Sequence, residues 1–247
     1  MSMHKENQIH GVTNSFVERF QVYLGEFVYG GIDGSVTTFA VVAGAVGAGL
    51  DSSVIIILGF ANLFADGFAM SIGAYLSAKS EKDNYAKHKK IEYWEVDHLP
   101  EKEREEVRDI YREKGFEGEL LEQVVEVITS DKDRWVDVMM KEELEMIEEK
   151  KSPFKIGLIT FVSFLLLGFI PLWVYVVDFL NEDLELNLLL WSSSLTAMSF
   201  ALIGYLKGVV NSKNKTYSVI STVLMGVSAA LVAYYVGDVL EKFVLSS

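Results

Sequence analysis

Pairs of glutamates at helical spacing are the residues of this sequence whose types and positions most directly suggest chemistry. Glu92 and Glu95 lie three residues apart, as do Glu103 and Glu106, so each pair projects from one face of its own helix. Bringing two carboxylates within about 5 Å of each other costs roughly 3 kcal/mol at an effective dielectric constant near 20. If the two helices converge, the cluster therefore needs bound protons or a bound cation.

A later stretch adds sulfur to this set of oxygen ligands. Met139, Met140 and Glu143 follow closely on one another, and Met139 and Glu143 share a helix face at a spacing of four. Thioether sulfur beside carboxylate oxygen favours a transition metal over calcium or magnesium, which prefer oxygen alone. The alternative is that these helices are simply solvated, as the alternating charges of "EKEREE" suggest. Spacing alone leaves both interpretations open.

Two aspartates interrupt segments that are otherwise apolar enough to cross a membrane. Asp33 and Asp66 each lie near the middle of such a segment, where a charge costs on the order of 3 kcal/mol. Asn62, Asp66 and Met70 follow one another at a spacing of four, which makes a polar and thioether stripe on one helix face. Intramembrane charges are typical of a cation path. The alternative is that one or both carboxyl groups are protonated and hydrogen-bonded within the bundle, and that Met70 is simply a core residue.

The composition predicts the elements that position these residues. The chain of 247 residues is 50% hydrophobic and carries 35 acidic and 22 basic residues, for a net charge of −13. Apolar residues gather in two blocks, with most of the charge between them, which indicates an all-α integral membrane protein with a polar insertion. The acidic balance argues against nucleic-acid binding and favours cationic partners. Without cysteine there is no disulfide or thiolate metal site, and no permanent cofactor is expected.

Five segments are long enough to span a bilayer as helices. They are residues 25–50, 54–78, 155–177, 188–206 and 217–240, and Pro171 is predicted to kink the third. The loops after the first and third spans lack Lys and Arg, whereas Lys207, Lys213 and Lys215 follow the fourth. Because short basic loops stay in the cytoplasm, we expect the N-terminus and the insertion inside and the C-terminus on the opposite side.

The expected domain organisation follows from these spans. Residues 1–24 form a cytoplasmic segment that lies along the membrane surface, residues 25–79 form spans one and two, and residues 155–247 form spans three to five. The insertion, residues 80–154, is predicted to contain three or four helices. Helical periodicity marks "HKKIEYWEV" as the first of them and continues to Glu149 in the last, "DRWVDVMMKEELEMIEE". Pro100 suits a first helical turn, and Gly115, Gly118, Ser130 and Asp131 mark breaks.

Two long motifs carry a resemblance to a known family. The stretches "GGIDGSVTTFAVVAGAVGAG" and "GFANLFADGFAMSIGAYLSAKSEKD" resemble the first two helices of the vacuolar iron transporter family of iron and manganese transporters. The resemblance implies a homodimer in the membrane that exports Fe²⁺ or Mn²⁺ from the cytoplasm in exchange for protons. It places the protein in the cell membrane of a prokaryote or in a vacuole-like organelle of a eukaryote.

The resemblance also implies roles for particular residues. Asp33 and Met70 match residues that line the family's translocation path at the dimer axis. Asp66 lies one turn after Asn62, where some relatives carry a carboxylate, and whether Asp66 takes over that task stays open. The metal-binding residues of the family's cytoplasmic domain match Glu92, Glu95, Glu103, Glu106, Met139, Met140 and Glu143.

Two other classes of protein compete with a transporter. A metal-buffering or sensing membrane protein would bind metal through the same insertion without transport. A di-iron carboxylate oxidase would use paired Glu-x-x-His motifs, of which Glu95 and His98 supply only one. We therefore expect a protein that is not an enzyme.

Overall fold

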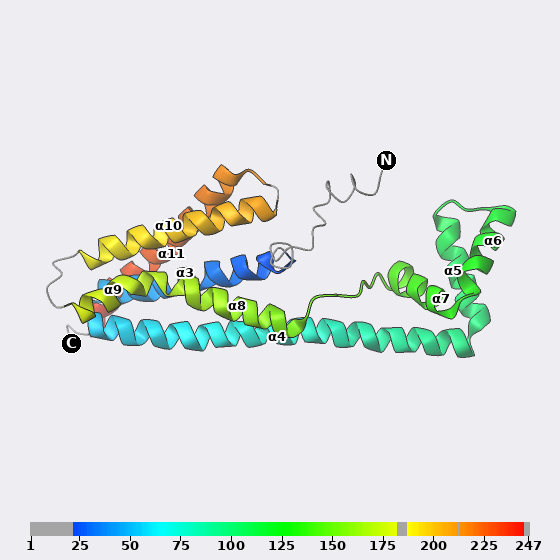
Figure 1. The fold of residues 1–247 in the computed structure, drawn as a ribbon, viewed down its shortest axis with the longest axis horizontal. Helices are drawn as coiled ribbons and strands as arrows, with labels where there is room; N and C mark the ends of the chain where they lie inside the picture. The colour runs from blue at the N-terminus through cyan, green and yellow to red at the C-terminus, as the bar shows by residue number, and fades with distance from the viewer. Residues whose placement is uncertain (1–21, 182–186, 212, 245–247) are drawn as a thin grey trace. The chain divides into compact units, whose positions relative to one another are not determined.

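The computed structural model describes residues 22–181, 187–211 and 213–244. All regular elements in these ranges are helices, which confirms the predicted fold class. The chain divides into two units, one formed by residues up to Tyr75 and from Pro153 onward, and the other by Leu76–Ser152 (Figure 1). Most of the predicted surface segment, residues 1–24, lies outside the described residues.

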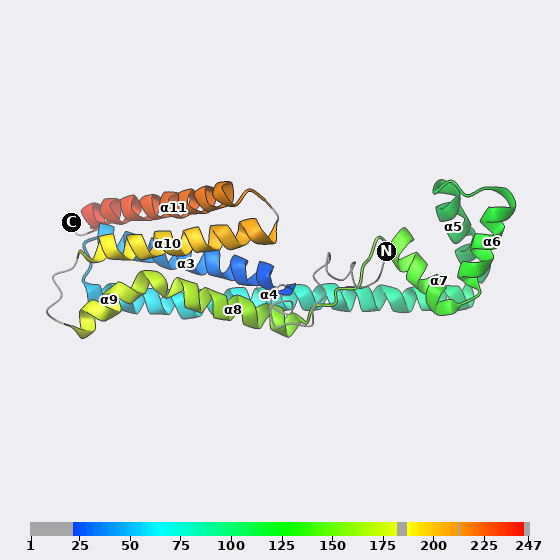
Figure 2. The same ribbon diagram turned by 45° about the horizontal axis from the view of Figure 1, so that its top comes forward.

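The first unit is a bundle of apolar helices. Its elements are α3 (Leu24–Gly47), the first part of α4 (Ser52–His98), α8 (Pro153–Gly168), α9 (Ile170–Leu180), α10 (Leu188–Val210) and α11 (Lys215–Val244). Within the described residues, four helices are long and apolar enough to cross a membrane, and the number is five if the bent pair of α8 and α9 counts as one span. The expectation of five spans therefore agrees with the structure. Figure 2 shows α3 flanked by α8 and α10, with α11 along the same bundle.

Glycines on α3 allow its backbone to approach α8 closely. A Cβ atom on Gly30 would lie 2.6 Å from the Thr160 carbonyl oxygen, and one on Gly34 would lie 2.5 Å from that of Phe164. Such distances exclude any side chain unless a helix moves. The glycines on either side of Asp33 therefore allow α3, the helix that carries this carboxylate, to pack closely against α8.

The predicted kink at Pro171 is present, because α8 and α9 meet at an angle of 50°. Proline lacks an N–H group and its ring clashes with the carbonyl four residues earlier, here that of Leu167. Serine hydroxyls of neighbouring helices donate hydrogen bonds to carbonyl oxygens beside the kink. The Ser35 hydroxyl donates to Leu167 O over 3.0 Å, and the Ser192 hydroxyl donates to Pro171 O over 2.7 Å. The first of these bonds replaces the one that Pro171 cannot donate, as a membrane interior requires.

The second unit is a small helical domain. It contains the end of α4, α5 (Pro100–Glu113), α6 (Gly118–Thr129), α7 (Lys132–Val138) and a π-helical turn, η1 (Met139–Glu143). The breaks lie where the sequence predicted them. Gly115 and Gly118 adopt φ angles of +93° and +58°, which favour glycine, and the Asp131 carboxylate caps α7 by accepting a bond from Arg134 N over 2.8 Å.

Two predicted helices of the insertion differ from the structure. The stretch around "HKKIEYWEV" does not form a separate helix, because α4 is one helix of 47 residues that runs through to His98. Residues 74–98 contain no glycine or proline that could interrupt it. The second span and the first helix of the insertion are therefore one element.

The last helix of the insertion is shorter than its sequence pattern predicted. The helical pattern continues to Glu149, but the π-helical turn ends at Glu143 and Glu145 adopts a φ of +51°. Met146 N donates to the Met140 carbonyl over 2.8 Å, and the Met146 side chain packs on the core of the unit. We infer that burying the Met146 side chain stabilises the unit more than further helical turns would.

Candidate metal centre

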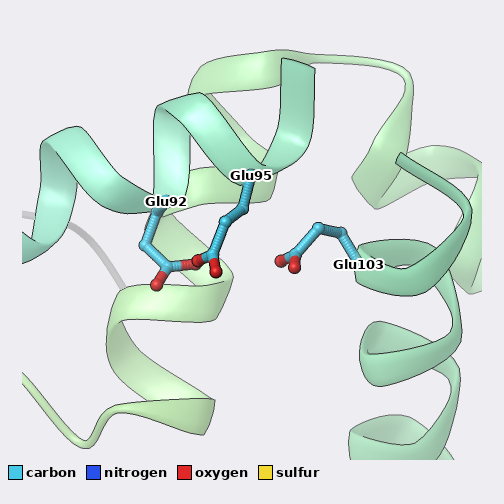
Figure 3. A group of neighbouring side chains, drawn as sticks. All are labelled: Glu92, Glu95 and Glu103. Carbon is cyan, nitrogen blue, oxygen red and sulfur yellow. The ribbon is translucent and has the colours of Figure 1, made fainter. Parts of the chain in front are cut away.

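Three glutamates from two helices point toward one another in the second unit. Glu92 and Glu95 project from the end of α4, and Glu103 projects from the first turns of α5 (Figure 3). Each offers a carboxylate oxygen, and these three oxygens all lie within 4.8 Å of one another. The two helices converge here because the chain turns between His98 and Pro100, where Leu99 leaves the helical conformation (φ −129°) and Pro100 begins α5.

A second group of carboxylates shares a member with the first. Oxygens of Glu103, Glu106 and Glu143 also lie within 4.8 Å of one another. Glu143 comes from the π-helical turn, a distortion that often occurs at functional sites. Glu103 belongs to both groups. The two groups therefore form one cluster of five carboxylates, which we call the glutamate cluster.

Two members of the glutamate cluster are buried without full hydrogen bonding. The side chains of Glu92 and Glu103 are only 3% and 1% exposed. Their Oε2 atoms are buried and find no hydrogen-bond donor in the described parts of the chain. A buried carboxylate without a donor is costly, so a proton or a cation is needed at these oxygens.

The pKa values of these carboxyl groups reflect that cost. Burial raises the pKa of Glu92 to about 7, and the charges of Glu143, Glu95 and Glu106 add to the effect. Burial, followed by the charges of Glu106, Glu95 and Glu92, also raises the pKa of Glu103 to about 7. The pKa of Glu143 is raised too, first by burial and then by Glu106. Near neutral pH, protons would therefore compete with any cation for these oxygens.

A lysine lies beside the glutamate cluster, which our sequence analysis did not anticipate. Lys102 Nζ lies 2.7 Å from Glu106 Oε1 and 3.8 Å from Glu103 Oε1. Its positive charge lowers the pKa values of Glu92, Glu103 and Glu143, against the larger effects that raise them. The spacing of four between Lys102 and Glu106 was a signal that could have revealed this pair.

The structure places both predicted methionine ligands in the hydrophobic core of the unit. Met139 and Met140 have no exposed surface and pack in a cluster with Val107, Val125 and Trp135. They belong to the same turn as Glu143. Metal ligation by their sulfur atoms stays a prediction, as it does for the five glutamates.

The predicted residues of the membrane path lie on two helices of the first unit. Asp33 on α3 and the stripe of Asn62, Asp66 and Met70 on α4 are all partly buried. The charges of Asp33 and Asp66 interact, so the structure brings the two carboxyl groups into one region of the bundle. Met70 also packs against the apolar core there.

Asn62 carries an unsatisfied polar group in this region. Its Nδ2 atom is buried and finds no acceptor among the described residues. It lies one helical turn from Asp66 on α4. The stripe on α4 therefore offers a hydrogen-bond donor, a carboxyl group and a thioether at successive turns.

The histidine of the single Glu-x-x-His motif is not a member of the glutamate cluster. The exposed His98 ring stacks on Trp94, with ring centroids 4.5 Å apart, and His98 Nδ1 lies 2.8 Å from the Trp94 carbonyl oxygen. The two metal-compatible groups in the described residues contain glutamates alone. This donor set fits a divalent cation site of carboxylates better than the paired Glu-x-x-His motifs of a di-iron oxidase.

Comparison with known proteins finds similar sequences that cover most of this chain. Residues 24–238 match the sequence model of the VIT family. The chain is 36% identical to the vacuolar iron transporter of Toxoplasma gondii, over 98% of this chain and 79% of that protein. It is 34% identical to the vacuolar iron transporter of Plasmodium falciparum, over 89% of this chain and 82% of that protein. It is 31% identical to vacuolar iron transporter 1 of Arabidopsis thaliana, over 87% and 85% of the two chains.

Proposed function

Because this chain belongs to the VIT family, we propose that it transports ferrous iron, and also Mn²⁺, across a membrane. Iron as the cargo rests on relatives named vacuolar iron transporter, which resemble the chain over most of its length. We further propose export from the cytoplasm in exchange for protons. The membrane is that of a vacuole-like organelle in a eukaryote and the cell membrane in a prokaryote.

The observation that carries the proposal is the presence of two partly buried carboxyl groups, Asp33 on α3 and Asp66 on α4, in one helical bundle. Both residues lie within helices long and apolar enough to span a bilayer. Two carboxylates that repel each other in such surroundings need a compensating cation or protons. If the same oxygens hold a divalent ion in one state and protons in the other, the metal ion and the protons cross the membrane in opposite directions and their fluxes are coupled.

The glutamate cluster supports a metal ion as cargo. Its carboxylates come from three elements, and two of its buried oxygens find no donor in the described residues. Carboxylates suit hard and borderline divalent ions, and thioethers on the membrane helix suit softer ones, so a set of both fits Fe²⁺ and Mn²⁺. We propose that the cluster captures the ion from the cytoplasm before transport.

A homodimer is the proposed assembly. Ala61, Ala65, Ala69 and Gly73 form an exposed stripe of small residues at a spacing of four on α4. Small residues at this spacing allow two membrane helices to approach closely. The stripe lies beside Asn62, Asp66 and Met70 on the same helix, so a second copy packed there would bring two sets of path residues together.

Flux measurements in proteoliposomes test the function. Vesicles with an acidic interior should take up Fe²⁺ or Mn²⁺ and lose internal protons at the same time, because the gradient drives protons outward. Asp33→Asn should abolish both fluxes, whereas Asp51→Asn, at the exposed loop before α4, should leave them unchanged.

The same vesicles distinguish transport from metal buffering. A buffering protein would bind metal and show no protein-dependent flux. Retained proton-coupled flux in the Asp33→Asn variant would disprove the assigned path. A metal flux that is insensitive to the pH gradient would reject proton exchange while leaving metal transport in place.

A further inference from the structure

The turn between α10 and α11 concentrates positive charge in an otherwise acidic protein. The chain has a net charge of −13, yet residues 186–237 contain no Asp or Glu. The only charged residues in that range are Lys207, Lys213 and Lys215, within nine positions of one another. This local excess of positive charge has no acidic counterpart nearby in the sequence.

Close packing of the two helices brings these lysines together. A Cβ atom on Gly208 would lie 2.9 Å from the Cα atom of Lys215, so the two helices are almost in backbone contact beside the turn. Lys213 N donates to the Gly208 carbonyl over 3.0 Å, which closes the turn. All three lysines therefore lie on one short, well-packed hairpin.

The lysines have no acidic partner in the described residues. None of them forms an ion pair there, and the ammonium of Lys215 instead lies 5.3 Å from the centre of the Tyr205 ring. Lys207 is partly buried, whereas Lys213 and Lys215 are exposed. By contrast, Lys242 near the other end of α11 is paired with Asp238 over 2.7 Å.

The hairpin lies at an end of the apolar bundle. In Figures 1 and 2 the turn between α10 and α11 lies at the same end of the bundle as the starts of α3 and α8. The exposed Tyr205 and Tyr217 flank it. Tyrosines with lysines at the ends of membrane helices are typical of the level at which lipid headgroups lie.

We propose that Lys207, Lys213 and Lys215 form a binding site for the phosphate headgroups of anionic lipids. Unpaired ammonium groups at this level attract negatively charged headgroups, and the apolar helices below contact the acyl chains of the same lipid. The phosphate supplies the negative charge that residues 186–237 lack. The site is independent of the metal path, because it contains none of the proposed path residues.

Lipid retention by the full-length protein tests the site. The purified protein is titrated with phosphatidylglycerol or with zwitterionic phosphatidylcholine, and bound lipid is counted by native mass spectrometry. Each lysine near an anionic surface contributes about fivefold in affinity, so replacing all three by glutamine should weaken phosphatidylglycerol binding about a hundredfold. The variant Lys242→Gln, on the same helix, should bind like the unchanged protein, and arginine at all three positions should preserve binding.

Three outcomes would overturn the proposal. The first is equal binding of phosphatidylglycerol by the triple glutamine variant. The second is equal retention of phosphatidylcholine and phosphatidylglycerol by the unchanged protein. The third is displacement of the lipid by inorganic phosphate at matched concentration, which would indicate a site for free phosphate. If the triple variant does not fold, the salt dependence of the unchanged protein decides, because binding through exposed ammonium groups must weaken as ionic strength rises.

Discussion

Lys102 Nζ lies 2.7 Å from Glu106 Oε1, which places an ammonium group within the glutamate cluster. The lysine side chain is 60% exposed, so it can leave the cluster without disturbing the core. Glu103 and Glu106 belong to one of the two metal-compatible groups. A metal ion that bound to these carboxylates would therefore have to displace the lysine, and we expect Lys102 to compete with the metal.

Replacing Lys102 by glutamine should increase metal affinity. The ion pair is exposed and therefore weak, so the expected gain is about threefold for Mn²⁺. Isothermal titration calorimetry of the full-length protein above neutral pH measures it. Lys141→Gln is the matched control, because Lys141 is paired with Asp137, which is not in the cluster. A weaker affinity in the Lys102 variant would mean that the lysine orients the carboxylates instead of competing with the metal.

Replacing Glu103 by glutamine should cause the largest loss of metal binding among the cluster residues. Glu103 is the member that both groups share, so the change removes one charged ligand from each. We expect at least about a tenfold loss of affinity, and a higher melting temperature without metal, because an unpaired buried charge disappears. Glu101→Gln, at an exposed position on the same helix, should change neither quantity. Unchanged affinity in the Glu103 variant would exclude the cluster as the metal site.

Metal affinity should rise with pH around neutrality. The pKa values of Glu92 and Glu103 are raised to about 7, so both carboxyl groups lose their protons between about pH 6 and 8 and become available as ligands. Calorimetric titrations with Mn²⁺ over this range measure the effect. With glutamine at both positions, the remaining binding should show a flatter pH dependence. A pH-independent affinity in the unchanged protein would contradict the assignment.

The stability of the metal-free second unit should change in the opposite direction. The folded-state pKa values of about 7 lie above the reference value of 4.5, so protonation of Glu92 and Glu103 favours the folded state. The stabilisation is complete below pH 4.5 and is lost as the pH rises through about 7. Melting followed by circular dichroism should therefore show a less stable metal-free domain at about pH 8 than at about pH 5, and added Mn²⁺ should restore stability at the higher pH.

The contact between α3 and α8 should not tolerate even a methyl group at Gly34. A Cβ atom there would lie 2.5 Å from the Phe164 carbonyl oxygen, a rigid backbone atom, so Gly34→Ala should destabilise the bundle by about 1–3 kcal/mol. Gly25→Ala, near the start of the same helix, makes the same substitution where no atom lies within 4 Å and should be neutral. Thermal unfolding in detergent compares the two variants. Equal melting temperatures of the two variants would mean that α3 and α8 can move apart at Gly34 without any loss of stability.

Local patterns in the sequence were sufficient for the helical architecture. Long apolar segments predicted the spans, Pro171 predicted the bend, and Pro100, Gly118 and Asp131 predicted where helices of the insertion begin. These features follow from backbone geometry and hydrophobicity, which act within a few residues. The unbroken α4 was missed although no glycine or proline interrupts residues 74–98. The early end at Glu143 was missed because it depends on the burial of Met146 in the core of the unit.

The sequence by itself determined which glutamates share a helix face, since a spacing of three leaves no other arrangement on a helix. Only the tertiary structure decided that Glu103 of α5 meets Glu92 of α4 and Glu143 of the π-helical turn, and that Lys102 lies beside them. Spacing describes one helix, whereas the charge, burial and pKa of a carboxyl group depend on every element that surrounds it. The chemistry of this cluster therefore arises from the packing of three segments that are separate elements along the chain.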